Sequence, residues 1–182
     1  MGDRMNLSKA MQLIRCDVAA NPSNPKAQIV LTAFRLTHLF ATAKTSNKAL
    51  WIAGIPIMIV YRIVVEWLLC VELPAKTQVG SGLRLYHGLA LVVNDHAQIG
   101  CDCTLRHVTT IGCKMLPSGE QGPAPVLGDR VDVGSNVVIL GGIRIGNDVV
   151  IGAGSVVVHD VPDNVTIVGN PARVLPKKFI SS

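Results

Sequence analysis

The sequence has few aromatic and few charged residues. Of its 182 residues, 4% are aromatic and 16% are charged, whereas 49% are hydrophobic. This hydrophobic content excludes the composition of a disordered protein, and any core must be filled mainly by aliphatic side chains. The length suits one domain, or a small helical segment joined to a compact β domain.

Paired cysteine motifs are also missing. The five cysteines, an odd number, include no CxxC pair. This argues against a disulfide framework and against a structural zinc site, and it indicates a reducing compartment. The chain does not open with a basic segment, an apolar stretch and a cleavage site, so we expect a cytoplasmic protein rather than an exported one.

Long uncharged apolar runs are absent. The longest, residues 49–61, has 13 residues and contains Pro56, whereas a membrane-spanning helix needs about 20. We therefore expect the apolar stretch 49–71 not to cross a bilayer. Arg62 and Glu66 are four residues apart and can pair on one helical face, while the other faces pack on protein or lie on a membrane surface.

The positive charge is confined to the first part of the chain. Residues 1–71 hold eight Lys or Arg and three Asp or Glu, which accounts for the whole net charge of +5, whereas residues 72–182 hold nine of each. No basic stripe with interleaved aromatics and no zinc-finger spacing is present, so a nucleic-acid partner is not expected. A basic, apolar segment could instead hold the protein at the anionic inner face of a membrane.

Two periodicities divide the chain. Residues 7–46 have helical spacing of apolar residues with a break at residues 21–25, which predicts two helices. From Val79 the period becomes six, and two insertions interrupt it: two residues around Asp95-His96, and a longer one between Ile111 and Leu127. Twelve hexads begin at Val79, Leu85, Leu91, Ile99, Leu105, Ile111, Leu127, Val133, Ile139, Ile145, Ile151 and Val157. This repeat predicts a solenoid whose turns bury a shared core only when stacked.

The hexads VGSGLRLYHG, IGCDCTLRHVTTIG, VDVGSNVVILGGIRIGNDVVIGAGSVV and DVPDNVTIVGNPARV resemble those of the hexapeptide-repeat acyltransferases. Within that superfamily the chain is most similar to the serine acetyltransferases and to relatives that acetylate exported polysaccharides, including the colanic acid biosynthesis acetyltransferases. The resemblance covers residues 79–175 and, more weakly, the helical part through RCDVAANP and FRLTHLF.

This resemblance implies a mainly β fold: a left-handed parallel β-helix of hexapeptide repeats, an exception to the usual right-handed crossover, preceded by an N-terminal helical segment. Three hexads per coil give four coils. The expected divisions are a helical region at 1–71, a β-helix domain at 72–175 with an inserted loop at 112–126, and a tail at 176–182. The family also implies a homotrimer whose sites are shared between subunits, and the loop would extend toward a neighbouring subunit's site.

Three hexads per coil would stack His87, His107, Ser135 and Ala153 in one outward column, about 4.8 Å apart. A column that is bulky at one end and small at the other suits an extended ligand arm whose reactive end lies at the histidines, although four ordinary surface residues would give the same pattern. The resemblance assigns the general base to His87, in LYHG. An imidazole with a pKa of about 6.5 can accept a hydroxyl proton near neutrality and return it to a leaving thiolate.

The resemblance also gives Glu72 a catalytic role. It lies 15 residues before His87, where relatives have the Asp that orients the imidazole and stabilises its charged form. The alternative is a solvated glutamate at the end of the apolar helix.

Acetyl-CoA is the implied acyl donor. Its pantetheine arm would run beside Ser135 and Ala153, next to His107, and phosphates would be met by basic side chains. Lys114, in the inserted loop, Arg173 and Lys177 are the candidates; a plain surface loop and a solvated basic tail are the alternatives.

Three departures from the serine acetyltransferases bear on the acceptor. Their second active-site His falls at Ala124, their Asp before the catalytic His is Tyr86, and the Asp that grips the serine ammonium aligns with Asn24. The lost carboxylates would have held a free amino acid's charge. We therefore expect a saccharide or lipid-linked sugar as acceptor, with Tyr86 and Asn24 as substrate-binding candidates. Serine O-acetylation for cysteine biosynthesis is the alternative.

The sequence leaves two further alternatives, a metal-dependent enzyme and a non-enzymatic scaffold. γ-Type carbonic anhydrases share the fold and bind zinc through histidines, two of them five residues apart. No two of the five histidines, at positions 38, 87, 96, 107 and 159, have that spacing, so no metal is expected. A solenoid that serves only as an interaction scaffold would be favoured by absence of acetyl-CoA binding.

Overall fold

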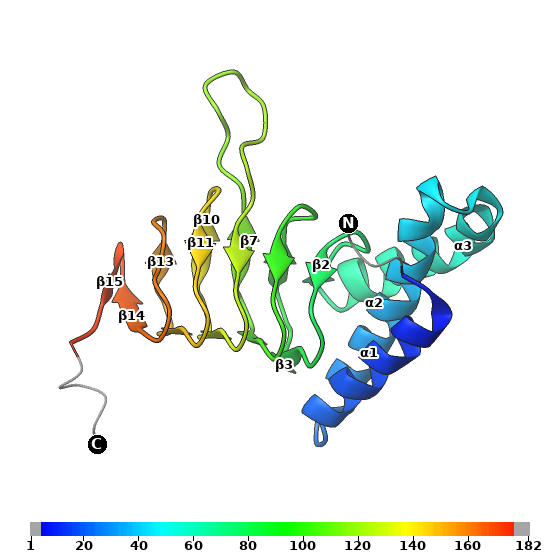
Figure 1. Ribbon diagram of the computed structural model, residues 1–182, viewed down its shortest axis with the longest axis horizontal. Coiled ribbons are helices and arrows are strands. Elements are labelled where there is room, and N and C mark those ends of the chain that lie inside the picture. The colour runs from blue at the N-terminus through cyan, green and yellow to red at the C-terminus, as the bar shows by residue number, and fades with distance from the viewer. Residues whose placement is uncertain (1–4, 177–182) are drawn as a thin grey trace.

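The computed structural model describes residues 5–176, with helices at one end and a stack of short strands extending from them (Figure 1). The two helices expected within residues 7–46 are confirmed as α1 (Leu7–Ala20) and α2 (Pro25–Thr42). Each begins after an asparagine whose side chain accepts a hydrogen bond from the first turn: Asn6 from the Lys9 amide and Asn24 from the Ala27 amide. These caps, with Pro25 at the first helical position, explain the break between the helices.

After the short 3₁₀ turn η1 (Ala43–Thr45), a third helix continues without interruption from α3 (Lys48–Tyr61) into the π-helical segment η2 (Arg62–Leu68). Arg62 and Glu66 pair at 3.3 Å, as expected. Together α3 and η2 form a 21-residue helix that, by length and composition, is able to cross a membrane. We expected the uncharged run to limit the length of this helix. That expectation was wrong, because the helix continues past the Arg62–Glu66 ion pair.

The strands form three sheets, named here by the order in which the chain first enters them. Sheet A contains β1 (Val71–Glu72), β4 (Leu91–Val93), β7 (Thr110–Gly112), β10 (Val138–Leu140) and β13 (Val156–Val157). Sheet B contains β2 (Gln78–Val79), β5 (Gln98–Ile99), β8 (Val126–Leu127) and β11 (Arg144–Ile145). Sheet C contains β3 (Arg84–Tyr86), β6 (Thr104–Arg106), β9 (Asp132–Val133), β12 (Val150–Ile151), β14 (Thr166–Gly169) and β15 (Ala172–Val174).

Within these sheets β14 and β15 pair antiparallel and the other strand pairs are parallel, so the chain winds as a parallel β-helix. It makes about five turns rather than the expected four. The difference arises at the ends, where β1 precedes the first hexad that we assigned and β14 follows the last.

The register of the coils corrects one insertion. Leu85 pairs with Leu105 and Val93 pairs with Ile111, so eight residues of one coil match six of the next. The two extra residues therefore lie in the corner 87–90, directly at His87, and not around Asp95-His96. The longer insertion is the loop between β7 and β8, which projects away from the solenoid (Figure 1).

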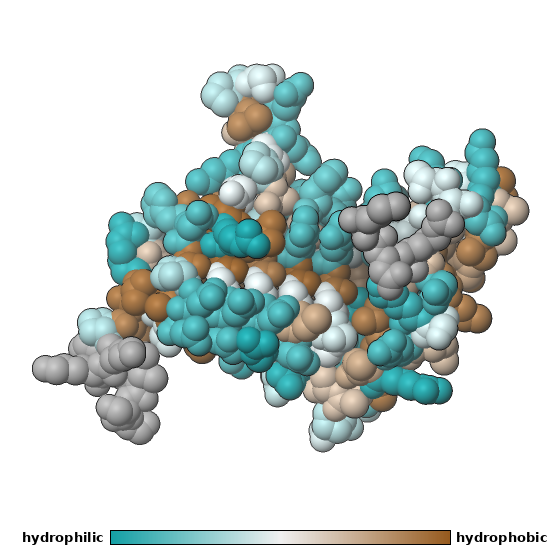
Figure 2. Space-filling view, in the orientation of Figure 1, coloured by the Kyte–Doolittle hydropathy of each residue, from teal (hydrophilic) through white to brown (hydrophobic). Residues whose placement is uncertain are grey.

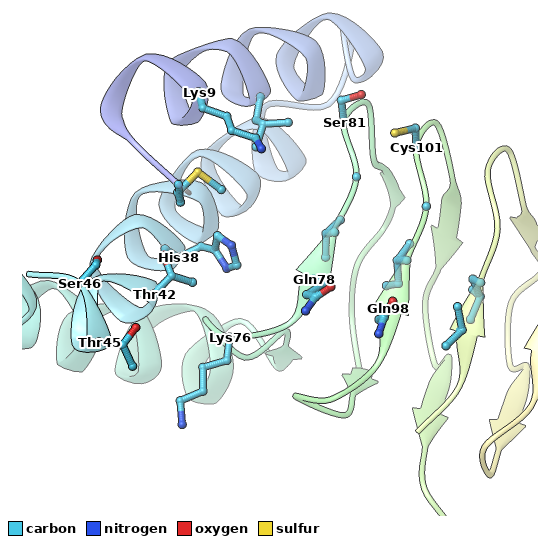
Figure 3. A pocket seen from close by; sticks show the side chains of 18 residues that line it. Lys9, His38, Thr42, Thr45, Ser46, Lys76, Gln78, Ser81, Gln98 and Cys101 are labelled. Atoms are coloured by element: carbon cyan, nitrogen blue, oxygen red, sulfur yellow. The ribbon is translucent and has the colours of Figure 1, made fainter. Parts of the chain in front are cut away.

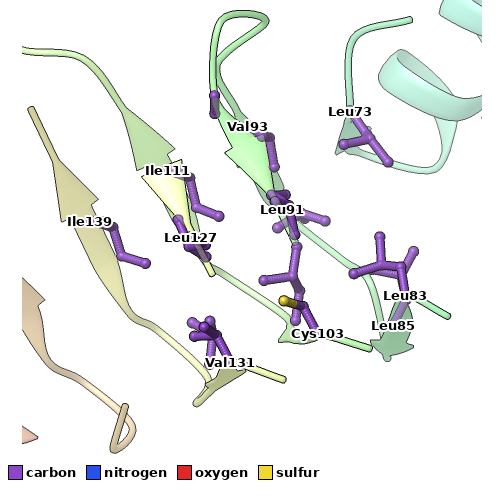
Figure 4. Packing of buried hydrophobic residues seen from close by; sticks show 14 of the residues in the cluster. Leu73, Leu83, Leu85, Leu91, Val93, Cys103, Ile111, Leu127, Val131 and Ile139 are labelled. Carbon is purple, nitrogen blue, oxygen red and sulfur yellow. The ribbon is translucent and has the colours of Figure 1, made fainter. Parts of the chain in front are cut away.

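Aliphatic side chains from all three sheets point into the solenoid, where Leu85, Leu91, Val93, Leu127 and Ile139 are buried together (Figure 4). Strands such as β4, β7 and β10 bury alternate residues, as period-two side-chain geometry requires. This explains how a core can form with so few aromatic residues.

A buried ion pair clips the helices onto the open end of the solenoid. The guanidinium of Arg35 donates to the Asp17 carboxylate at 2.7 Å and to the carbonyl oxygen of Val79 at 2.7 Å. Asp17 in turn accepts from the amides of Gly82 and Leu83 at 2.9 and 3.1 Å. The clip thus satisfies backbone groups that have no preceding coil to bind.

Candidate active site

The predicted column lies at the corner between sheets C and A. His87 and His107 directly follow the paired residues Tyr86 and Arg106. The pairing of Thr104 with Asp132 and of Val133 with Ile151 places Ser135 and Ala153 at the same position of the next coils. The structure therefore brings His87, His107, Ser135 and Ala153 into one row, in the predicted order.

The two imidazoles of this row are in contact. Their ring centroids are 5.6 Å apart and the rings meet edge to face at 81°. His87 is exposed, whereas Nδ1 of His107 is buried and has no hydrogen-bond partner within residues 5–176. Because buried polar atoms are normally paired, this nitrogen marks a place where a ligand could supply the missing partner.

The backbone around His87 is unusual. His87, Gly88 and Ala90 have φ of 65°, 48° and 52°, so three of the four residues in the corner 87–90 are left-handed. Other corners also hold a left-handed non-glycine residue, such as Asn136, so this corner is distinguished by its insertion and by two adjacent left-handed residues. The bulge is held by the Val108 amide, which donates to the Leu89 carbonyl at 2.8 Å, and by Lys26 of α2, whose Nζ donates to the His87 carbonyl at 3.3 Å.

Glu72 lies on the exposed outer side of β1. Among the described residues it makes no hydrogen bond or ion pair with His87, so the expected carboxylate–imidazole contact is not formed here. Catalytic contacts often tighten only when substrate is bound. The orienting role of Glu72 accordingly stays a prediction.

The two substrate-binding candidates have different surroundings. Asn24 uses both ends of its amide on the backbone: Oδ1 accepts from the Ala27 amide at 3.0 Å and Nδ2 donates to the Leu85 carbonyl at 2.8 Å. This gives Asn24 a positioning role, fixing α2 against β3. Tyr86 is 49% exposed beside His87, and the Arg106 guanidinium lies 5.4 Å from its ring centroid. Arg106 is itself paired with Asp132.

The remaining acetyl-CoA candidates are not all near the row. Ser135 is half-buried and Ala153 is exposed. Arg173 lies exposed on β15, beyond the Ala153 end of the row. Lys114 packs over Gly141 in the loop at the opposite corner of the coil, so within one chain it does not join the row. Lys177 lies outside the described residues.

The surfaces on either side of the row differ in chemistry, which sequence reasoning missed. After Glu72 on its first strand, sheet A turns uncharged side chains outward at Val92, Thr110, Val138 and Val156. Sheet C turns outward a polar set at Arg84, Tyr86, Arg106 and Asp132. The hexad pattern could have assigned these outward positions once the register was known.

A large cleft lies elsewhere, between the helices and sheet B (Figure 3). Its volume is about 810 Å³, and its lining includes Lys76, Gln78 and Gln98 but none of the predicted site residues. His38, at its edge, donates from Nδ1 to the Ala75 carbonyl at 2.7 Å, and burial lowers its pKa. Within residues 5–176 no group of three or more His, Cys, Asp or Glu is arranged to hold a metal ion.

Comparisons with known proteins agree with this architecture. Residues 124–159 match the family described as bacterial transferase hexapeptide (six repeats). Over 160 residues the chain is 37% identical to WcaB of Escherichia coli, which is named as a colanic acid biosynthesis acetyltransferase, and the match covers 87% of this chain and 96% of WcaB. The chain belongs to the hexapeptide-repeat acetyltransferases. This confirms the predicted family and enzyme class: the protein is an acyltransferase.

Serine acetyltransferases are similar over a smaller part of their length. That of Helicobacter pylori is 37% identical over 107 residues, covering 59% of this chain and 61% of the relative. Among solved structures, the soybean serine acetyltransferase apoenzyme has a TM-score of 0.73 and 26% identity, covering 92% of this chain and 69% of that one. The Neisseria gonorrhoeae enzyme in complex with serine has a TM-score of 0.74 and 25% identity, over 93% and 70%. These neighbours confirm the predicted left-handed β-helix.

Proposed function

We propose that this acetyltransferase transfers an acetyl group from acetyl-CoA to a sugar hydroxyl in polysaccharide biosynthesis. The observation that carries this proposal is the extent of the similarity to WcaB, which includes the helical region and 96% of that protein. The Helicobacter pylori serine acetyltransferase is matched over only 61% of its length.

The surroundings of His87 support a neutral acceptor. The residue before it is Tyr86 rather than an acid, and Asp132, the acid on the outer side of sheet C, is already paired with Arg106. Asn24 uses its amide on the backbone, and Ala124 packs against the core. Apart from Glu72, the catalytic candidate on β1, an amino acid's ammonium group therefore finds no free carboxylate among the site candidates, whereas the exposed Tyr86 offers a flat apolar ring and a hydroxyl to a saccharide.

In the proposed mechanism His87 acts as general base and transfer is direct. His87 accepts the proton of the acceptor hydroxyl while that oxygen forms a bond to the thioester carbonyl carbon; the carbon–sulfur bond then breaks and His87 returns the proton to the leaving thiolate. The small side chains of Ser135 and Ala153 leave space for the pantetheine arm along the row. Arg173, past its far end, could meet the phosphates, with Lys177 as the second candidate.

The outer surface of sheet A supports a homotrimer. It is uncharged over Val92, Thr110, Val138 and Val156 and borders the row. A second copy seated on it would bury these side chains and close one wall of the site. It would also allow Lys114, which lies at the opposite corner, to reach the row of a neighbouring subunit. We place the enzyme in the cytoplasm, because its cysteines are unpaired in the structure and suit a reducing compartment.

Serine acetylation is the second candidate, favoured by the structural similarity to a serine acetyltransferase in complex with serine. An assay of thiol release from acetyl-CoA, run against L-serine and a panel of free, nucleotide-linked and lipid-linked saccharides, separates the two. We expect a saccharide to be acetylated at least about tenfold faster than serine. Efficient serine turnover without saccharide turnover would replace our proposal with cysteine biosynthesis, and absence of acetyl-CoA binding would favour a scaffold.

The same assay tests the base. We expect His87→Ala to lower turnover by about 10² to 10⁴, the usual effect of losing a positioned general base. His96→Ala is the matched control and should keep full turnover, because it removes an exposed imidazole whose ring is bonded, within residues 5–176, only to its neighbour Asp95. A folded His87→Ala protein with near-native activity would remove His87 from the mechanism.

A further inference from the structure

The helix formed by α3 and η2 exposes an apolar side along its whole length. Only 17% of its most hydrophobic 18-residue stretch is buried inside the protein, although the mean hydropathy of that stretch is 1.8. Figure 2 shows hydrophobic side chains gathered at this end of the molecule. The exposed large hydrophobic side chains of this helix are Ile52, Ile57, Ile59, Val60, Ile63, Val64, Trp67 and Leu68. A contiguous patch of this kind on a soluble protein marks an interaction surface.

The opposite side of the same helix is fixed to the protein. Gly54 lies so close to the Phe40 ring of α2 that a side chain there would collide with it. Tyr61 is buried and its hydroxyl donates to the Leu73 carbonyl at 2.7 Å, and Val65 is buried one turn later. These residues are spaced by seven and four, so they form one helical stripe.

This attachment decides how the helix can meet a membrane. If it spanned a bilayer, α2 would have to enter the hydrocarbon beside it, together with the buried charge of Arg35. The contact of Tyr61 with Leu73 would also draw the start of the β-helix to mid-membrane depth. The helix can therefore present only its exposed side, lying flat.

Aromatic and basic residues are placed at the edges of the apolar side. Both tryptophans of the chain are in this helix, Trp51 near its start and Trp67 near its end; at about 1.5 Å per residue they are about 24 Å apart. The Lys44 ammonium lies 5.4 Å from the Trp51 ring centroid, and the Arg62 side chain is 68% exposed. Tryptophan and basic side chains with apolar stems are those that favour the headgroup region.

We propose that α3 and η2 lie in the plane of a bilayer surface that contains anionic lipids, with the apolar side in the acyl boundary and the basic side chains among the headgroups. A second copy of the chain is a poorer occupant, since a two-fold contact through this side would bring Lys44, Lys48 and Arg62 toward the same charges of its partner. An anionic lipid surface would instead attract these basic side chains. The inference is independent of which acceptor the enzyme uses.

The test uses the full-length protein, without acceptor, and two vesicle preparations: phosphatidylcholine alone, and phosphatidylcholine mixed with phosphatidylglycerol. We expect flotation with the anionic vesicles and a blue shift of tryptophan emission, which reports this helix directly because both tryptophans are in it. The double variant Ile59→Glu, Trp67→Glu changes two exposed side chains and should reduce the bound fraction at least about tenfold. Ile29→Glu, an exposed position on α2, introduces the same kind of charge and should bind like the wild type.

Four results would overturn the inference. The first is no flotation and no emission shift with anionic vesicles, and the second is equal binding by the double variant and by Ile29→Glu. The third is a lower oligomeric mass of the double variant without lipid, which would make this side an interface between copies. The fourth is resistance of the bound wild type to an alkaline carbonate wash, which would indicate a spanning helix. Because acetyl transfer is not measured, failure here does not affect the proposed acceptor.

Discussion

At the scale of single residues, the site combines an exposed imidazole with a buried one. His87 stands on a left-handed corner that Lys26 and a hydrogen bond from the next coil hold in place. The ring of His107 packs against it with one nitrogen unsatisfied. In the proposed mechanism, reaction chemistry therefore belongs to the solvent side of the pair, while His107 would fix the ring and bind the donor. The row continues in the small residues Ser135 and Ala153, where the proposal places the donor's arm.

Ala153→Leu tests whether acetyl-CoA uses that room. Ala153 is exposed, so a larger side chain needs no core space and the melting temperature should stay within a few degrees. Acetyl-CoA affinity, measured by calorimetry, should fall by about tenfold or more, because the new isobutyl group occupies the path of the pantetheine arm. His159→Leu, at an exposed position on another corner, is the control. Unchanged affinity in Ala153→Leu would mean that the donor does not run along this row.

At the scale of elements, the helices and the solenoid are joined by polar contacts as well as by packing. Asp17 and Arg35 are almost completely buried, yet every charged oxygen and most guanidinium donors have partners. Asn21 adds hydrogen bonds to both the amide of Leu85 and the carbonyl of Leu83. The first coil has no preceding strand to pair with, so these side chains serve as its hydrogen-bonding neighbour.

Breaking this clip should destabilise the protein strongly. Asp17→Asn keeps the shape of the side chain but leaves Arg35 buried without a counter-charge. It also points an amide NH₂ group at the guanidinium or backbone N–H donors that the carboxylate accepts from. We expect a loss of about 3–5 kcal/mol in the free energy of unfolding, measured by urea denaturation. The matched change Asp148→Asn affects an ion pair with Arg130 that lies on the surface and should have little effect. A small effect of Asp17→Asn would show that packing alone holds the helices to the first coil.

At the scale of the whole molecule, three surfaces have separate uses. The outer side of sheet A, uncharged from Val92 to Val156, borders the candidate row. The polar outer side of sheet C carries the substrate-binding candidate Tyr86, and the apolar side of α3 and η2 points away from the solenoid. If sheet A lines a trimer axis, the loop 112–126 leaves each chain at the corner nearest a neighbour. The site would then be complete only in the assembly.

Val138→Lys tests this arrangement, since it places a charge in the middle of the uncharged surface of sheet A. We expect the trimer to dissociate, as judged by light scattering, and turnover to fall at least about tenfold because one wall of the site is lost. Val150→Lys makes the same change on the exposed surface of sheet C and should leave the oligomer intact. A trimer that survives Val138→Lys would place the subunit contact on another face.

The hexad period by itself determined the solenoid, because an aliphatic residue at every sixth position must face a shared interior, and it was enough to align His87, His107, Ser135 and Ala153. The helices before and after residues 21–25 could also be predicted from the sequence, since their caps and proline are local signals. Only the tertiary structure decided where the two-residue insertion lies, at His87, and that Asn24 spends its amide on backbone hydrogen bonds. It also decided that Glu72 makes no bond to the imidazole. The Asp17–Arg35 clip and the continuity of the helix across Arg62 and Glu66 are likewise visible only in the structure. Each of these depends on which distant segments meet. Hydrogen bonds between coils fix the register, and the fit of α1 and α2 against the first coil fixes the clip, whereas spacing along the chain constrains neither.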